Sequence, residues 1–399
     1  MLAFAANPDL VASSPYKAID TSLQDATETL LDKGRLAIIY AGDSRDENAV
    51  IRPGNNVRPW KSYKAVAQDI AATLNRLGAR HVAVLPEDMN LAAALKAQRI
   101  DYAWLNTGGL QGLGSAGHAA AVLEMLGLPY VGHDPLTAAT LDDKNYFKRH
   151  MLALGIPTAP FCTWHPDEGP FLPEWSDAFN RAFASWNGAF VVKPVNGRAS
   201  LHVVHVDNRA DLVGAVLETF EQCRNRVLIE AYLPGREYCA AVCGPSIRRD
   251  GTLLQTGEPF VFGCVERVLD PGEKIFTSMD VRPITAGRVR LLDAGKDGAV
   301  LSRLENLARR VYRELPLETL VRLDVRADAS GELYVLEANP KPDLKAPQDG
   351  VTSIIAEGLG PTGLSYDDLI YSLLAESLAR SLTNKRAPDF LRDKQAISA

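Results

Sequence analysis

The sequence predicts an α/β chain of more than one domain, and three observations support this. Up to about residue 131, apolar strands alternate with amphipathic helices, which is typical of a parallel sheet with crossover connections. From Ala189 onward, short strands separated by turn pairs such as Pro234-Gly235 and Asp250-Gly251 replace that alternation. The length of 399 residues fits two or three domains at roughly 150 residues each.

The first region contains the clearest alternation. An apolar strand is entered through Lys33-Gly34-Arg35, and Gly78 closes the helix that follows, as glycine commonly does at a helix C-terminus. In chain order we expect strands at 36–40, 81–85 and 102–105, and helices at 62–77, 91–98 and 119–125.

The rest of the chain adds helices and a hairpin. Gly155 and Pro157 should stop a helix that begins near Pro135, and Ala329-Ser330-Gly331 is a turn between two apolar strands. We therefore expect helices at 135–154, 298–313 and 365–382, a hairpin with strands 321–328 and 332–339, and a flexible tail at 384–399.

Composition excludes several classes of function. A net charge of −6, from 49 acidic and 43 basic residues, argues against a nucleic-acid-binding protein. No apolar run approaches the ~20 residues that cross a membrane. Five cysteines, an odd number, predict reduced thiols in a cytoplasmic protein. The N-terminus lacks the basic start of a signal peptide, so residues 1–33 are interpreted as an extension before the first domain.

The hairpin carries the strongest chemical signal. Side chains alternate faces along a strand, so Arg322 and Asp324 share one face, as do Glu337 and Asn339 on the returning strand. The opposite face, which includes Leu336, suits packing. Two carboxylates and an amide oxygen are hard ligands of the kind that Mg²⁺ takes. The alternative is a solvent-facing hairpin with ordinary polar alternation.

Two further strands end in polar residues. Lys193 follows the apolar run Phe190-Val-Val, and the small-residue loop up to Ser200 could surround phosphates with backbone N–H groups. Taken alone, this pattern is better explained by a lysine that snorkels from the end of a strand. Glu230 interrupts another apolar strand, and Glu237 follows the next turn. The backbone of this segment could hydrogen-bond the edge of an adenine, and Glu237 could bind a ribose. Taken singly, each glutamate is more often a solvated residue at the edge of a sheet.

A competing motif is Gly112-Leu-Gly114-Ser-Ala-Gly117, which matches the dinucleotide-binding pattern G-x-G-x-x-G. Two strands precede it, whereas that fingerprint belongs to the first strand–helix turn. Six residues separate Leu105 from Gly112, too many for the tight turn. A nicotinamide-dependent oxidoreductase is therefore a weak alternative.

Together these stretches resemble the ATP-grasp superfamily, and within it the D-alanine–D-alanine ligase-like branch. The resemblance covers about residues 36–382. Its matching stretches are GLPYVGHDPLTAATLDDKNYFKRHMLALGIPTAPF, FVVKP, VLIEAYLPGREYCAAVCG, VRLDVRADASGELYVLEANP and GLSYDDLIYSLLAESL.

The resemblance implies an ATP-grasp fold, in which a parallel α/β domain precedes two α+β subdomains that clasp ATP. The implied divisions are 1–33 (extension), 34–143 (N-terminal domain), 144–238 (central subdomain), 239–383 (C-terminal subdomain) and 384–399 (tail). The resemblance also implies an ATP-dependent ligase that joins a small-molecule carboxylate to an amine through an acyl phosphate and releases ADP and phosphate. The sequence leaves a homodimer open.

Site residues carried over from the resemblance fall into three groups. The nucleotide would be held by Lys144, Lys193, Glu230, Tyr232, Leu233, Glu237 and, in a loosely matched stretch, Lys274. One or two Mg²⁺ ions, replaceable by Mn²⁺, would be held by Asp324, Glu337 and Asn339. Arg322 would face the oxyanion of the tetrahedral intermediate, and Ser200 would close over the phosphates.

The sequence departs from that branch at its substrate loops. The metal-binding Asn is usually followed by Thr-Ser-Pro-Gly, but Asn339 is followed by Pro340-Lys-Pro-Asp-Leu-Lys345. The His-Gly loop of the first domain is Asn106-Thr-Gly-Gly109 here, and the early acid aligns near Asp46 or Glu47. We therefore expect a substrate other than D-alanine. The alternatives are a genuine D-alanine–D-alanine ligase, another ATP-grasp subclass, or a non-catalytic nucleotide-binding module.

Overall fold

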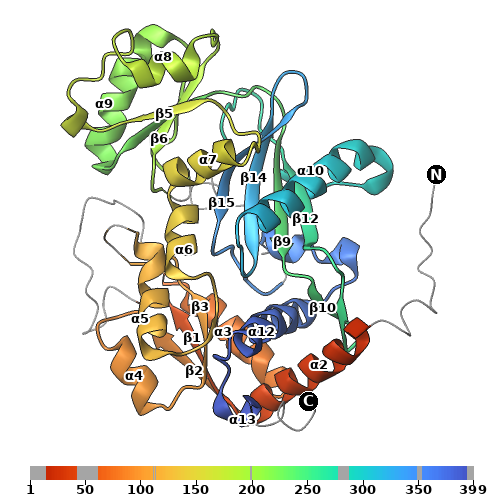
Figure 1. Ribbon diagram of the computed structural model, residues 1–399. Helices are drawn as coiled ribbons and strands as arrows, with labels where there is room; N and C mark the ends of the chain where they lie inside the picture. Colours follow the sequence, from red (N-terminus) through yellow and green to blue (C-terminus); the bar gives the residue numbers. More distant parts are fainter. Residues whose placement is uncertain are drawn as a thin grey trace.

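Three larger sheets and one two-stranded hairpin form the computed structural model, within the residues described below (Figure 1). The structure describes residues 15–42, 62–110, 112, 114–197, 200–276, 287–347 and 353–392, with side chains from residue 22 onward. The mixed α/β class predicted from the sequence is confirmed.

The N-terminal sheet is parallel, with strand order β2-β1-β3-β4. The predicted alternation of strands and helices is confirmed to within two residues at each end. Its strands are β1 (Arg35–Tyr40), β2 (His81–Pro86), β3 (Tyr102–Asn106) and β4 (Tyr130–Val131), and its helices are α3 (Lys64–Arg76), α4 (Leu91–Ala97) and α5 (His118–Leu126). Because parallel strands share one carboxyl edge, Ala41 and Thr107 lie side by side at the edge where ligands bind in such folds.

The second sheet is antiparallel and forms one end of the molecule (Figure 1). Its order is β5 (Phe161–Trp164), β8 (Val227–Ala231), β6 (Phe190–Pro194) and β7 (Val204–Val206). Helices α8 (Asp177–Phe183) and α9 (Leu212–Cys223) pack on it. Their shared core is rich in phenylalanine, and Phe179 stacks near both Phe183 and Phe190.

The third sheet faces the second across a cleft. Its order is β13 (Val289–Leu291), β12 (Phe260–Arg267), β9 (Glu237–Cys243), β14 (Val321–Ala327) and β15 (Leu333–Asn339). Every residue of β9, the central strand, is buried. Helix α10 (Ala294–Glu314) covers one face, and its capping residue Asp293 starts it earlier than the sequence indicated.

The two chain ends pack together beneath the N-terminal sheet. Helix α2 (Pro15–Lys33) contacts α12 (Tyr366–Thr383) and the hairpin β10 (Ser246–Arg249)–β11 (Thr252–Gln255). The described part of the expected extension, residues 15–33, is this helix, and its Leu30 is fully buried. In the described part of the expected tail, residues 384–392, helix α13 (Asp389–Arg392) buries Leu391 in the same core.

The single helix expected over 135–154 is two helices. Asp143, in an extended conformation, ends α6 (Pro135–Asp142) and begins α7 (Lys144–Ala153). Its side chain accepts a hydrogen bond from the Tyr146 N–H at 2.9 Å, which is the usual role of an N-cap aspartate. The break makes Lys144 the first residue of α7, facing the cleft.

Two further observations bear on function. None of the helices within the described ranges is long and apolar enough to cross a membrane. All five cysteines are buried and free of disulfides. The short helix α11 (Ile354–Glu357) completes the C-terminal region.

We predict that Leu391→Ala lowers the free energy of unfolding by about 2–4 kcal/mol, because it empties a buried site between α13 and α2. Thermal unfolding measures the loss. Leu152→Ala, at a helix position 58% exposed, is the control and should change stability by less than about 0.5 kcal/mol. Equal effects of the two substitutions would show that the C-terminal helix does not contribute to the core.

Candidate active site

One cleft is lined by nearly all the site residues expected from the sequence. Eleven of the twelve residues expected to bind nucleotide, bind metal or take part in catalysis line it, and Lys274 does not. The walls come from β6, β8, β9, β12, β14 and β15, with Ala41, Tyr63 and Gly109 of the N-terminal domain at one end. The proposed roles of these residues remain predictions, but seven of them lie on five strands, β6, β8, β9, β14 and β15, which explains why polar side chains interrupt so many apolar runs.

A buried carboxylate between two lysines organises one wall. Glu230 on β8 contacts Lys193 of β6 at 3.0 Å and Lys148 of α7 at 2.7 Å. Burial would raise the pKa of Glu230, but the two ammonium groups outweigh it and the pKa lies below its ordinary value. Burial lowers the pKa of Lys148 to about 8. The Glu230 carboxylate outweighs the same effect at Lys193, whose pKa is raised.

Lys144 joins this wall to the opposite one. Its Nζ donates to the Gly197 carbonyl at 3.0 Å and lies 3.1 Å from Oε2 of Glu337. Ser200, at the other end of that loop, has its Oγ 3.1 Å from the Phe276 carbonyl. Gly197 is therefore tied to α7, and Ser200 to the segment that follows β12.

The polar residues of the two hairpin strands lie opposite one another, as the alternation of side chains predicted. Arg322 pairs directly with Asn339, and Asp324 with Glu337. A register shift follows Asp324, and it moves Leu336 from the packing face expected for it to the lining of the cleft. Val335 is fully buried in the core instead.

Two arginines hold the buried Asp324 carboxylate. Arg322 Nε lies 2.8 Å from Oδ1, and Arg267 Nη1 of β12 lies 3.1 Å from Oδ2. Burial would raise the pKa of Asp324, but the guanidinium groups of Arg267 and Arg322 hold it well below its usual range. The carboxylate is therefore charged at any physiological pH.

Glu237 is held in the same way. It accepts from Arg267 at 2.9 Å and from Arg326 at 3.2 Å, and Arg326 also reaches the Tyr232 hydroxyl and the Lys274 carbonyl at 3.0 Å each. The residue expected to bind ribose is thus already paired with two cations. Lys274 contributes its backbone rather than its ammonium group to this contact.

Sequence reasoning missed Lys148, Arg267 and Arg326. Arg326 continues the alternation of Arg322 and Asp324 and could have been found from it. Arg267 ends an apolar strand, as Lys193 does, so the same signal was present. Lys148 lies on a helix and gave no local signal.

The donor set of the hairpin fits a hard divalent cation. Asp324, Glu337 and Asn339 bring oxygen atoms from neighbouring strands, and Nδ2 of Asn339 is buried without a hydrogen-bond partner. Within the described ranges no cluster of three or more His, Cys, Asp or Glu forms a metal site, because the third ligand here is an amide. A cation at Asp324 would have to draw an oxygen away from Arg322 or Arg267.

Of the three motif glycines, Gly117 has a packing explanation, because a Cβ on it would lie 2.6 Å from the Pro135 carbonyl oxygen. Gly112 and Gly114 have positive φ (87° and 61°), a backbone conformation that favours glycine in any turn. The motif glycines therefore have structural roles that do not require a dinucleotide.

The loop after Asn339 forms the end of the cleft nearest the N-terminal domain. Pro340, Lys341, Pro342 and Asp343 line it, and Oδ1 of Asp343 is buried without a hydrogen-bond partner. The Nζ of Lys341 lies 3.2 Å from the centre of the Tyr63 ring. The early acid expected at Asp46 or Glu47 lies outside the described residues.

Known proteins similar to this chain agree on one family. The family model described as "D-ala D-ala ligase C-terminus" matches residues 151–375. A D-alanine–D-alanine ligase of Synechococcus sp. (strain JA-3-3Ab) is 28% identical, with the match covering 86% of this chain and 97% of that protein. A D-alanine–D-alanine ligase of Pseudomonas putida (strain GB-1) is 27% identical, over 90% and 99%.

Solved structures share the fold. The D-alanine–D-alanine ligase from Bacillus anthracis complexed with ATP superposes with a TM-score of 0.63 at 19% identity, covering 88% of this chain and 99% of that one. The D-alanyl-alanine synthetase A from Vibrio cholerae gives the same TM-score and identity, over 87% and 99%. The ATP-grasp fold expected from the sequence is confirmed.

We predict that Glu230→Gln lowers the free energy of unfolding by about 3 kcal/mol, because it leaves two buried lysines without their carboxylate. The loss should be seen in thermal unfolding at pH 7. Since the folded pKa of Glu230 is depressed, its stabilising effect is present above about pH 4.3 and disappears as the pH falls through the folded pKa. Exposed Glu221→Gln is the control, and a wild-type melting temperature in Glu230→Gln would contradict the prediction.

Proposed function

Because this chain belongs to the D-Ala–D-Ala ligase family of ATP-grasp enzymes, we propose that it joins two molecules of D-alanine in an ATP-dependent reaction. ATP and Mg²⁺ are the cofactors, and ADP is a product, as the sequence indicated. The choice of D-alanine rests on the relatives, which are D-alanine–D-alanine ligases and so favour that alternative over a different substrate.

One observation supports the chemistry most strongly: the cleft opposes the Lys144–Lys193 wall to the Arg322–Asp324 hairpin. Lys144 and Lys193 supply cations for the phosphates of ATP, and Lys144 already bridges to Glu337 at 3.1 Å. Phosphoryl transfer to a carboxylate depends on positioning and charge stabilisation and needs no protein nucleophile.

Asp324, Glu337 and Asn339 would hold the divalent cation, which when bound neutralises the charge on the transferred phosphoryl group. Arg322 lies beside them on the same face and would hydrogen-bond the oxyanion formed when the amine attacks the acyl phosphate. Its guanidinium is kept in place by the 2.8 Å contact with Asp324. Tyr232 and Leu233 would line the base, and Ser200 would help to close the cleft over the phosphates.

A second candidate function is ligation to an amine other than D-alanine, and Asp343 favours it. Its partnerless carboxylate oxygen lines the cleft, where it would repel the α-carboxylate of a second D-alanine and accept a hydrogen bond from an amine. The sequence of this loop predicts on these grounds that D-alanine is a poor substrate. The relatives do not support that prediction, so it stands as the alternative.

The proposal also places the enzyme in the cytoplasm, where its five buried cysteines would stay reduced. A homodimer remains open. The domain divisions expected at residues 34–143, 144–238 and 239–383 are kept as part of the proposal, with the break at Asp143 as a natural boundary.

Steady-state assays with D-alanine test the substrate. We predict ADP and phosphate release coupled to D-alanyl-D-alanine formation, with kcat/KM of ~10⁴ M⁻¹s⁻¹ or above. Replacement of Asp343 by glycine should lower the KM for D-alanine if the carboxylate opposes it. Phosphate release with other amines, but none with millimolar D-alanine, would reject the main proposal in favour of the alternative.

The metal ligands make a separate prediction. Glu337→Gln and Asp324→Asn should each lower turnover by ~10²-fold or more, because charge on the transferred group loses its counter-ion. Asp328→Asn, in the exposed turn of the same hairpin, is the control and should keep wild-type turnover. Normal turnover and Mg²⁺ dependence in either of the first two variants would remove the metal assignment.

A further inference from the structure

Helix α7 carries two buried lysines that reach different walls of the cleft. Lys144 and Lys148 are four residues apart, so they lie on one face of the helix, one turn from each other. Lys144 lies 3.1 Å from Glu337 of the β14–β15 hairpin, whereas Lys148 lies 2.7 Å from Glu230 of the opposite wall. Helix α7 also packs against β15. The helix is therefore placed to hold the two walls relative to each other.

Lys148 is not a substrate-binding residue. Its side chain is fully buried and does not line the cleft. An ammonium group without exposure to water is costly unless carboxylates or hydrogen-bond acceptors surround it. Glu230 is one such partner, and the linker between α7 and β5 supplies another.

The partner of Lys148 in that linker is Thr158. Lys148 Nζ donates to the Thr158 hydroxyl at 2.6 Å, and the hydroxyl donates to the Val335 carbonyl at 2.7 Å. The Val335 N–H donates to the Pro157 carbonyl at 2.9 Å. The linker thus binds both backbone groups of Val335, and contacts through Lys148 and Thr158 join Glu230 to β15.

Val335 is the residue at which the register of the hairpin shifts. Val325 pairs with Val335, whereas Asp324 pairs with Glu337, so Leu336 is the extra residue on β15. A bulge of this kind redirects the side chains next to it. The linker therefore holds the strand immediately before Leu336 and Glu337, which both line the cleft.

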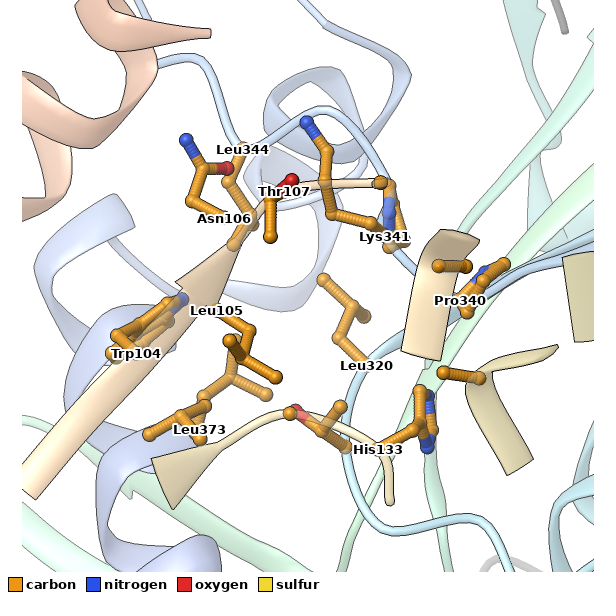
Figure 2. A pocket seen from close by; sticks show the side chains of 17 residues that line it. Trp104, Leu105, Asn106, Thr107, His133, Leu320, Pro340, Lys341, Leu344 and Leu373 are labelled. Carbon is orange, nitrogen blue, oxygen red and sulfur yellow. The ribbon is translucent and has the colours of Figure 1, made fainter. Parts of the chain in front are cut away.

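The loop that follows this strand is anchored separately on the N-terminal domain. Its Ala346 N–H donates to Asp69 of α3 at 3.1 Å. Figure 2 shows Pro340 and Lys341 of the loop around a small pocket that Thr107 also lines. The expected metal ligands of β15 thus lie between two anchors, and the linker is the anchor that leads to the opposite wall.

We propose that Lys148 and Thr158 are positioning residues that keep the expected metal ligands of β15 at a fixed distance from the wall of Glu230 and Lys193, where ATP is expected. Lys148 contacts Glu230 and Thr158 at once, and Thr158 passes this constraint to the strand just before Glu337. Without this Lys148–Thr158 relay, both walls keep their shape, but the hairpin shifts relative to the phosphates of bound ATP. The identities of the two sites rest on the proposed function.

Thr158→Val tests the relay, because it keeps the shape of the side chain and removes both hydrogen bonds of the hydroxyl. In the full-length protein, calorimetry with the non-hydrolysable ATP analogue AMP-PNP, in Mg²⁺ or in EDTA, measures how far Mg²⁺ tightens nucleotide binding. We expect this tightening to be about tenfold smaller in Thr158→Val, since removing a residue that supports metal ligands changes metal affinity by about this factor. Binding in EDTA should be unchanged, because Glu230 keeps both lysines.

Matched variants separate the hydroxyl from packing. Thr158→Ser keeps the hydroxyl and should keep the wild-type effect of Mg²⁺. Thr219→Val makes the same exchange at a buried threonine of α9 whose hydroxyl has no hydrogen-bond partner, so it should leave the effect of Mg²⁺ unchanged. Lys148→Met should reduce the effect as Thr158→Val does, and the double variant should be no worse than Lys148→Met alone. If Lys148→Met does not fold, the two Thr158 variants decide.

Three results would overturn the relay: a wild-type effect of Mg²⁺ in Thr158→Val, an equal loss in Thr158→Ser, or the same loss in Thr219→Val. Failure of the proposed function looks different. Tightening of AMP-PNP binding by Mg²⁺ in the wild type, without ligation of D-alanine, would reject the proposed substrate and leave the relay standing. Absence of any tightening in the wild type would reject the metal assignment and the relay together.

Discussion

Charge balance in the cleft constrains the rest of the structure. Each of three buried carboxylates is held by two cations: Glu230 by two lysines, and Asp324 and Glu237 by arginines that include the shared Arg267. Five cations thus surround three carboxylates, and because loss of one partner would leave the other buried charge uncompensated, the members of this network hold one another in place. The pairs join β6 to β8 in one sheet, and β9, β12 and β14 in the other.

Two local breaks in regular structure determine which side chains face the cleft. Asp143 interrupts a helix and turns Lys144 into the cleft, while the register shift after Asp324 sends Leu336 there and Val335 into the core. At the first break, the Asp143 side chain caps α7. At the second, β14 stays paired with β15 on one side and with β9 on the other. Small irregularities in otherwise ordinary elements therefore position the reacting groups, as β-bulges commonly do near active sites.

Features that depend on neighbouring residues could be predicted from the sequence, whereas features that depend on contacts between distant segments could not. Strands and helices of the N-terminal domain follow from local periodicity and glycine punctuation, and the pairing of Asp324 with Glu337 follows from hairpin alternation. Arg267 itself ends an apolar strand, but its contact with Asp324 could not be predicted, because β12 and β14 are separated in the sheet by β9. The helix break lacked Gly or Pro as a signal, and the packing of the polar C-terminal segment depends on a distant partner, α2. Tertiary context decided these three features.

The loop after Asn339 bears directly on the question of substrate. In the cleft it presents an oxygen of Asp343 that has no hydrogen-bond partner. A glycine turn at this place would offer backbone donors and flexibility, whereas Pro340 and Pro342 lack backbone N–H groups and fix φ. The sequence departs from the family in this loop and at Asn106–Gly109, at the end of the cleft nearest the N-terminal domain. The charge network that supports the chemistry lies on strands outside these loops, so the substrate can differ while the chemistry is kept.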